Sequence, residues 1–197
     1  MSKERFYDLL SETRRKGIDF VIWGLEDIGF CEAPASSKFH LAKKGGLLEH
    51  SLNVYEAACF IRDQVIRRKP EMEELLPMDS VVLSTLLHDV CKSDIYKEGI
   101  ARRKNANGFW ENYVGYNVDY GAGLPLGHGE KSVIILLSWG LELKPEEMLA
   151  IRWHMAAWDM PFQNAEYKES FNAAKAKTPL VSLIQAADAI ATGLLEF

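Results

Sequence analysis

The chain places an adjacent histidine and aspartate, His88 and Asp89, in the otherwise apolar segment around residues 86–91. An imidazole beside a carboxylate is a strong chelate for a divalent metal ion. A chain with this many histidines and aspartates contains about 0.25 such doublets by chance, so the doublet alone is a weak signal. Its interpretation therefore depends on the other histidines and aspartates of the chain.

Four more residues of these types stand in apolar segments or near expected helix ends. His50 lies in the first turn of one helix, His128 where another begins, and His154 near the end of a third. Asp188 lies within an apolar helix, where a carboxylate is costly unless it is paired or binds a metal. Together with the doublet these are six N and O ligands, more than one tetrahedral site needs. The set predicts one or two divalent ions, with Fe, Mn, Zn, Ni or Co favoured over Mg alone.

The order of these residues resembles the HD superfamily of metal-dependent phosphohydrolases. The whole pattern H…HD…H…H…D is present and spans residues 50–188. Lys92 adds the HDxxK form common in that family, and the segment 45–52 is similar to that of HD-type 3′–5′ exoribonucleases and related hydrolases. The resemblance implies one all-α HD domain over residues 1–197, a bundle of helices with its metal-site core at about 46–192.

The resemblance also implies a role for each ligand. His50, His88, Asp89 and Asp188 correspond to the core metal ligands. His128 and His154 correspond to the extra pair of members with two metal ions, in which the aspartate of the doublet bridges both. Two ions about 3.5–4 Å apart can activate a water and also clamp the attacking and leaving oxygens. In the alternative, His128 and His154 contact the substrate phosphate around a single ion.

Asp89 and Lys92 are the candidate catalytic residues. Asp89 would orient the attacking water or take its proton. Lys92 lies on the same helical face as the doublet and could neutralise a phosphoryl oxygen of the substrate. The alternative for Lys92 is a solvated side chain at a helix end, where it suits the helix dipole. His40 either touches substrate or belongs to an exposed loop.

These residues favour a hydrolase of phosphate mono- or diesters that works by attack of a metal-bound hydroxide. The expected partner is a small phosphorylated substrate, a nucleotide or the end of a single-stranded oligonucleotide. One alternative is a catalytically silent HD-type module that binds a ligand or signals, although all six positions are intact here. The other is an HD-type di-iron oxygenase, which uses the same constellation of ligands.

Composition narrows the class of protein further. The chain is 48% hydrophobic and 26% charged, with a formal net charge of −5, which argues against a broad surface for duplex nucleic acid. No apolar run reaches the roughly 18 residues of a membrane span. The three cysteines are far apart and form no CxxC motif, which is typical of reduced thiols in a cytoplasmic protein. Oligomeric state has no signature in the sequence.

The elements that must position these residues are mainly helices. Apolar spacing predicts helices over about 2–16, 20–28, 47–68 and 129–139, with a loop over 31–44. Asp79 or Ser80 is expected to cap the helix that carries the doublet. Pro145 and Thr178-Pro179 are expected to start two further helices.

The pattern changes between residues 93 and 127. Asn107-Gly108 is a strong turn signal, so we expect a short hairpin or irregular insertion around residues 95–125. Its aromatic residues, Trp110, Tyr113, Tyr116 and Tyr120, have two interpretations. They pack the hairpin through aromatic cross-strand pairs, the favoured interpretation, or they form a lid that stacks a base.

Overall fold

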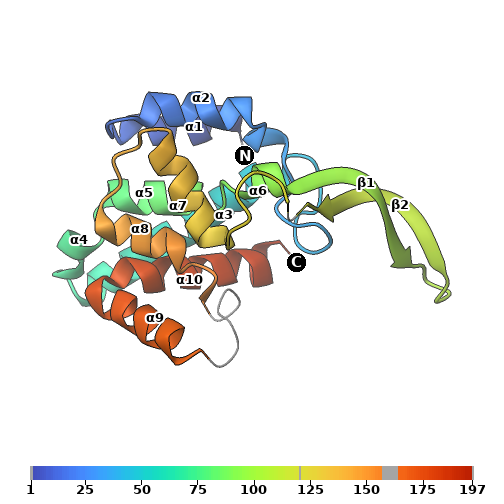
Figure 1. Cartoon of the computed structure of the whole chain (residues 1–197). Coiled ribbons are helices and arrows are strands. Elements are labelled where there is room, and N and C mark those ends of the chain that lie inside the picture. Colours follow the sequence, from blue (N-terminus) through green and yellow to red (C-terminus); the bar gives the residue numbers. More distant parts are fainter. Residues whose placement is uncertain (1, 120, 157–163, 197) are drawn as a thin grey trace.

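The computed structural model describes residues 2–119, 121–156 and 164–196, and it is mainly helical with one two-stranded sheet (Figure 1). The helical elements are α1 (Lys3–Glu12), α2 (Ile18–Asp27), a 3₁₀ turn (Phe30–Glu32), α3 (Gly46–Arg68), α4 (Met72–Leu75), α5 (Met78–Leu87), α6 (Lys92–Ile95), α7 (His128–Ser138), α8 (Pro145–Arg152), α9 (Ala165–Lys177), α10 (Pro179–Ile190) and a π-helical turn (Ala191–Leu195). The mainly helical expectation is confirmed, and the expected loop over 31–44 contains only the 3₁₀ turn.

The prolines of the sequence mark the helix starts more accurately than the expected capping residues Asp79 and Ser80 do. α8 begins at Pro145, and Thr178 caps α10 by accepting a hydrogen bond from the Leu180 amide at 3.2 Å. The expectation that Asp79 or Ser80 caps α5 is wrong. Both residues lie inside α5, because the extended backbone of Pro77 already allows the helix to begin at Met78.

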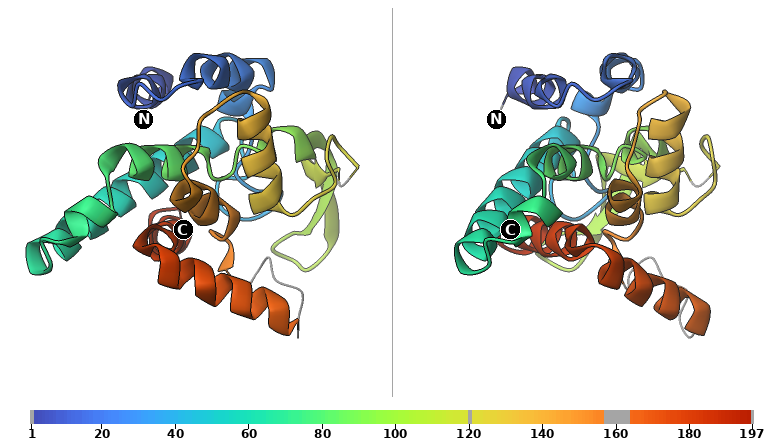
Figure 2. Two further views of the ribbon diagram at one scale, coloured as in Figure 1. Left: turned by 60° about the vertical axis from the view of Figure 1, so that its left-hand side comes forward. Right: turned by 90° about the vertical axis from the view of Figure 1, so that its left-hand side faces the viewer.

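The described residues form two hydrophobic cores. One joins the start of α3 to α1, α2 and α7, and the other joins the rest of α3 to α9 and α10. α3, α5 and α8 contribute side chains to both cores, and the views in Figure 2 show α3 running from the interior of the molecule to one edge. Polar side chains on these three helices can therefore meet where the two cores join.

A buried carboxylate fixes the start of α8. Glu147 is fully buried and accepts two hydrogen bonds from the Arg15 guanidinium, both at 2.7 Å. It also accepts from the Ser80 hydroxyl at 2.6 Å and from the Lys144 amide at 2.7 Å. Because its oxygens are fully used, this charge can be buried without an unpaired polar atom, and it links α8 to α5 and to the turn before α2.

α9 was not expected from the apolar pattern, since only Ala174 on it is buried. The helix is set instead by Asn164, which caps it by accepting from the amides of Glu166 and Tyr167, and by residues of high helix propensity. Among the described residues no single helix is long and apolar enough to cross a membrane. α9 and the helical segment Pro179–Leu195 are long and apolar enough only when they are counted together, and the two are bent by 105° relative to each other.

The insertion is a regular hairpin that extends away from the helices (Figure 1). β1 (Tyr96–Lys104) pairs antiparallel with β2 (Trp110–Val118), within the range expected from the sequence. The Asn105 side chain accepts from the amides of Asn107 and Phe109, and Gly108 has a φ of +80° that suits the turn.

The expected aromatic cross-strand pairs do not form. Trp110 stands opposite Lys104, and Tyr113 stands opposite Ala101. Tyr116 stands opposite Glu98, while Tyr120 lies outside the described residues. The register set by the turn after Lys104 places every described aromatic residue of β2 against a non-aromatic partner, so packing between rings does not hold the hairpin together.

Candidate metal centre

Five of the six residues predicted as metal ligands meet in one place, here called the His–Asp cluster. Nε2 of His50 lies 3.2 Å from Nε2 of His88 and 3.4 Å from Oδ1 of Asp188. Nε2 of His88 is 3.2 Å from Oδ2 of Asp89, and Nε2 of His154 is 3.3 Å from Oδ1 of the same carboxylate. Residues 138 positions apart in the chain thus present ligand atoms to a common point.

Four elements that pack against one another bring the His–Asp cluster together. His50 lies on α3, the doublet follows the last residue of α5, His154 lies in the turn after α8, and Asp188 lies on α10. The three imidazoles and Asp89 are buried, whereas the Asp188 side chain is 17% exposed. Asp188 therefore lies on the solvent side of the cluster, where a substrate could reach it.

The histidine rings are fixed by backbone carbonyls. Nδ1 of His88 donates to the carbonyl of Thr85 at 2.7 Å, and Nδ1 of His154 donates to that of Ile151 at 2.7 Å. A neutral imidazole with its proton on Nδ1 has its lone pair on Nε2. Both rings therefore direct Nε2 lone pairs into the cluster, which is the tautomer that a metal ligand requires.

Glu196 gives His50 the same orientation, and the sequence analysis missed it. Its two carboxylate oxygens lie 3.0 and 3.1 Å from Nδ1 of His50, and Asn53 donates to one of them at 2.9 Å. Burial raises the pKa of the Glu196 carboxyl, but the hydrogen bonds from His50 and Asn53 and the charge of His50 together hold this pKa below its usual range. A carboxylate behind a histidine ligand fixes the ring and makes it more basic.

The π-helical turn explains how Glu196 reaches the cluster. Residues eight apart, such as Asp188 and Glu196, differ by about 80° around an ideal α-helix. The wider π-helical turn over Ala191–Leu195 rotates less per residue and brings Glu196 back toward the side that carries Asp188. No apolar period or motif announces such a turn, so the residue had no signal in the sequence.

The His–Asp cluster has the chemistry of a metal site. Lone pairs on two Nε2 atoms 3.2 Å apart repel each other unless a cation lies near them. Among the described residues, the buried atoms Oδ1 of Asp89 and Nε2 of His154 make no hydrogen bond, which is costly for buried polar atoms. Mixed imidazole and carboxylate donors suit a transition metal. These buried groups could hold a metal ion.

The doublet and Lys92 form a strongly coupled charge system. Nζ of Lys92 lies 2.5 Å from Oδ2 of Asp89, and both side chains are buried, so Lys92 is not the solvated residue of the alternative interpretation. Burial raises the pKa of Asp89, but Lys92 and His88 hold it well below its usual range. Burial lowers the pKa of His88, but the charge and hydrogen bond of Asp89 together with the charge of Asp188 outweigh burial and raise this pKa. Asp89 is therefore held as a carboxylate, the form in which it can bind a metal ion.

A cavity of about 710 Å³ opens beside the His–Asp cluster. Its polar side includes His154, Asp188 and Lys92. The remaining lining residues are Phe39, His40, Met155, Ala156, Gln185, Ala189 and Thr192. His40 therefore belongs to the site: its ring centroid is 5.1 Å from that of His50, and burial together with His50 lowers its pKa. The lining of the cavity thus combines charged and polar side chains with apolar ones such as Phe39 and Met155.

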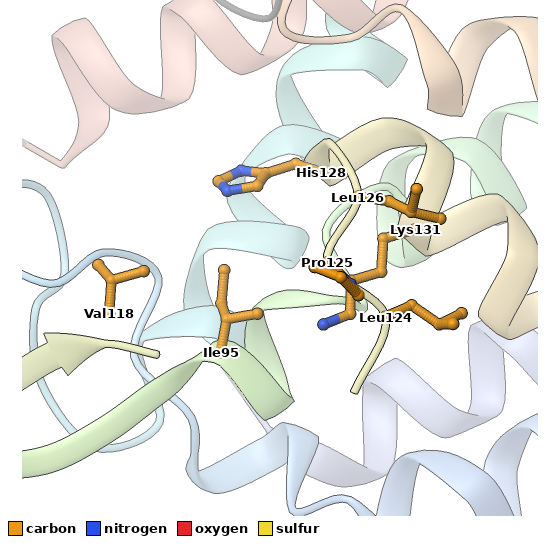
Figure 3. A pocket seen from close by; sticks show the side chains of 7 residues that line it. All are labelled: Ile95, Val118, Leu124, Pro125, Leu126, His128 and Lys131. Carbon is orange, nitrogen blue, oxygen red and sulfur yellow. The ribbon is translucent and has the colours of Figure 1, made fainter. Parts of the chain in front are cut away.

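The structure does not bring His128 into the His–Asp cluster. It is the first residue of α7 and lines a separate pocket of about 220 Å³ with Ile95, Val118, Leu124, Pro125, Leu126 and Lys131 (Figure 3). In the described ranges its ring nitrogens join none of the groups close enough to share an ion. Gly129 fixes this placement, since a Cβ there would lie 2.1 Å from the Arg152 carbonyl oxygen, which holds the start of α7 tightly against α8.

The fold and the site define a mainly helical protein with a buried histidine–aspartate cluster that could hold a metal ion. Over 117 residues the chain is 30% identical to the dihydroneopterin 2′,3′-cyclic phosphate phosphodiesterase of Methanocaldococcus jannaschii. The alignment covers 55% of this chain and 43% of the relative, so the chain matches less than half of the relative's length. No family model matches the sequence, and no solved structure matches it.

Proposed function

We propose that the protein is a metal-dependent phosphodiester hydrolase of the HD superfamily. The observation that carries the proposal is the convergence of three histidine Nε2 atoms and two aspartate carboxylates at the edge of a cavity. His50, His88, Asp89 and Asp188 would be the core ligands, and His154 would add a further ligand or contact the substrate phosphate. The similarity to a cyclic phosphate phosphodiesterase supports the reaction class.

The chemistry divides between the ion and the side chains. When bound, a divalent ion supplies a water of lowered pKa and neutralises phosphate charge. Asp89 orients the attacking water or accepts its proton, since Oδ1 has no hydrogen-bond partner among the described residues. Lys92 lines the cavity from the Asp89 side and stabilises the negative charge that develops on the phosphoryl oxygens.

The cavity indicates the kind of substrate. A phosphate group would occupy the end with His154, Asp188 and Lys92, and the organic part would lie against Phe39 and Met155. A volume of about 710 Å³ is in the range of small-molecule sites. We propose a small nucleotide-like phosphodiester, a class that includes cyclic phosphates. His128 has no ligand role in this proposal because it lines another pocket.

The proposal is tested with the purified protein supplied with Mn²⁺ and assayed on bis(p-nitrophenyl) phosphate and a panel of cyclic nucleotides. We expect hydrolysis that a chelator abolishes and that Asp89→Ala reduces to background, together with a loss of bound metal. Asp79→Ala is the matched control, because Asp79 is an exposed aspartate at the other end of α5. It should keep full activity.

Hydrolysis that survives Asp89→Ala would sink the mechanism. Protein that purifies without transition metal, binds none on addition and turns over no phosphorylated substrate would support the silent binding module instead. Iron content with oxygen uptake and no phosphodiester turnover would indicate the di-iron oxygenase.

A further inference from the structure

The hairpin presents one face that is open, partly apolar and positively charged, here called the outer face. Side chains alternate along a strand, so the register of β1 and β2 places Ile100, Arg102 and Lys104 on the same side as Trp110 and Val114. All five are exposed, with Trp110 at 60% and Ile100 and Val114 each at 71%. The bundle does not cover this face, because the hairpin extends away from the helices (Figure 1).

The outer face combines an aromatic ring with two cations. The guanidinium of Arg102 and the ammonium of Lys104 each lie 5.6 Å from the ring centroid of Trp110. Neither cation forms an ion pair with a carboxylate in the part of the chain that the structure describes. Next to them, Ile100 and Val114 stand directly opposite each other and form a small aliphatic platform. The charges of Arg102 and Lys104 therefore remain available to an anion.

The opposite face of the hairpin is already occupied by its own side chains. A Cβ on Gly115 would lie 2.6 Å from the Tyr113 ring and 3.2 Å from Cβ of Ala101, so these side chains cover the glycine. Arg103 on this face donates to Glu111 at 2.7 Å, which neutralises its charge. Arg103 lies over the Tyr113 ring at 5.0 Å, so the cation beside the ring of this face is ion-paired, whereas those beside Trp110 have no carboxylate partner in the described residues.

We propose that the outer face binds single-stranded nucleic acid, with a base stacked on Trp110 and backbone phosphates beside Arg102 and Lys104. Aromatic rings flanked by cations are the common recognition chemistry for single strands, because every base has a stacking face and every linkage carries a negative charge. Arg102 and Lys104 lie on the same side as the Trp110 ring, and neither has a carboxylate partner among the described residues. A second copy of this chain fits less well, since a twofold contact would place these cations close to their own symmetry mates.

This inference does not depend on the proposed hydrolase activity. The test titrates the protein into a labelled oligouridylate of twelve nucleotides, or into the matching oligothymidylate, and measures fluorescence anisotropy. Both probes have phosphorothioate linkages, which keep the charge and resist cleavage. We expect binding of both within a few-fold, because the contacts involve bases and phosphates, with a dissociation constant that rises with salt. Arg102→Glu with Lys104→Glu should weaken binding by at least tenfold, and Trp110→Ala by about tenfold.

The control is Lys97→Glu with Lys168→Glu, which changes charge equally at exposed sites off the outer face. It should change affinity by less than threefold, and all variants should keep the wild-type melting temperature and Mn²⁺-dependent hydrolysis of small substrates. Absence of binding by the wild-type protein, or equal losses in the control, overturns the proposal. Self-association in light scattering that Val114→Glu abolishes, without oligonucleotide binding, would assign the face to a second copy.

Discussion

At the scale of single residues, ring orientation decides what the histidines can do. Nδ1 of His50, His88 and His154 each has an acceptor behind it, so each ring turns Nε2 toward the same point. A spacing of histidines in a sequence carries no information about which nitrogen faces inward. The role of these acceptors can therefore be tested by substitution where the acceptor is a side chain, as it is for Glu196.

Removal of the Glu196 carboxylate should weaken metal binding. Loss of a group behind a histidine ligand typically costs 10–100-fold in metal affinity, so Glu196→Ala should raise the Mn²⁺ dissociation constant by about that factor. Glu196→Gln should cost less, because its amide oxygen can still accept from His50. Calorimetric titration with Mn²⁺ measures both, with Glu169→Gln on exposed α9 as the control. Equal affinities for all three variants would show that Glu196 does not position His50.

Lys92 can be separated from metal binding. Lys92→Met keeps most of the volume of the buried side chain but removes the charge beside Asp89. We expect kcat on a phosphodiester to fall by about 100-fold, with Mn²⁺ stoichiometry retained, because the lost interaction stabilises the transition state. Lys168→Met, at an exposed position, is the matched control. An unchanged kcat would exclude a catalytic role for Lys92.

At the scale of elements, the ends of α3, α5, α8 and α10 form the site. Each helix begins for a local reason, such as Pro145 in α8 or the Thr178 cap of α10. Their relative placement depends on contacts between elements, for which Glu147 is the clearest example. Its partners Arg15 and Ser80 are 132 and 67 positions away along the chain.

The Glu147 network should be worth a large part of the stability of the fold. Glu147→Ala leaves the Arg15 guanidinium partly buried without its partner, so we expect the free energy of unfolding to fall by about 3–5 kcal/mol. Urea denaturation followed by circular dichroism measures the change. Glu146→Ala, one residue earlier and less buried, should change it by only about 0.5 kcal/mol. Similar losses for the two variants would contradict the assigned role.

At the scale of the whole molecule, the His–Asp cluster joins the two hydrophobic cores. A metal ion there would cross-link α3, α10 and the ends of α5 and α8, so metal binding and folding should be coupled. The hairpin is not part of this arrangement, since neither core includes a residue of β1 or β2. Removal of the metal ion should therefore change the stability of the fold, whereas substitutions on the outer face of the hairpin should change nucleic-acid binding.

Metal removal should lower the melting temperature of the wild-type protein. An ion at 100 times its dissociation constant stabilises the folded state by about 2.7 kcal/mol. For a chain of this size that corresponds to about 5–10 °C. Scanning calorimetry before and after dialysis against EDTA measures the shift, and Mn²⁺ should restore it. Asp89→Ala should show no such shift, and an equal shift in that variant would place the stabilising ion elsewhere.

The sequence by itself determined the local features of this protein. The order of histidines and aspartates, the three-residue step from Asp89 to Lys92, the turn at Asn107-Gly108 and the start of α8 at Pro145 all depend on neighbours along the chain. They predicted the mainly helical fold, the hairpin and five of the residues that meet in the His–Asp cluster.

Tertiary structure alone decided the rest. It placed Glu196 behind His50, 146 positions away, through a π-helical turn, and it left His128 in a different pocket although its place in the pattern matched. It also left Trp110 exposed where aromatic packing was expected. The physical reason is the same in each case: these outcomes depend on how rotated elements pack against one another, and the spacing of residues along one element does not specify that rotation.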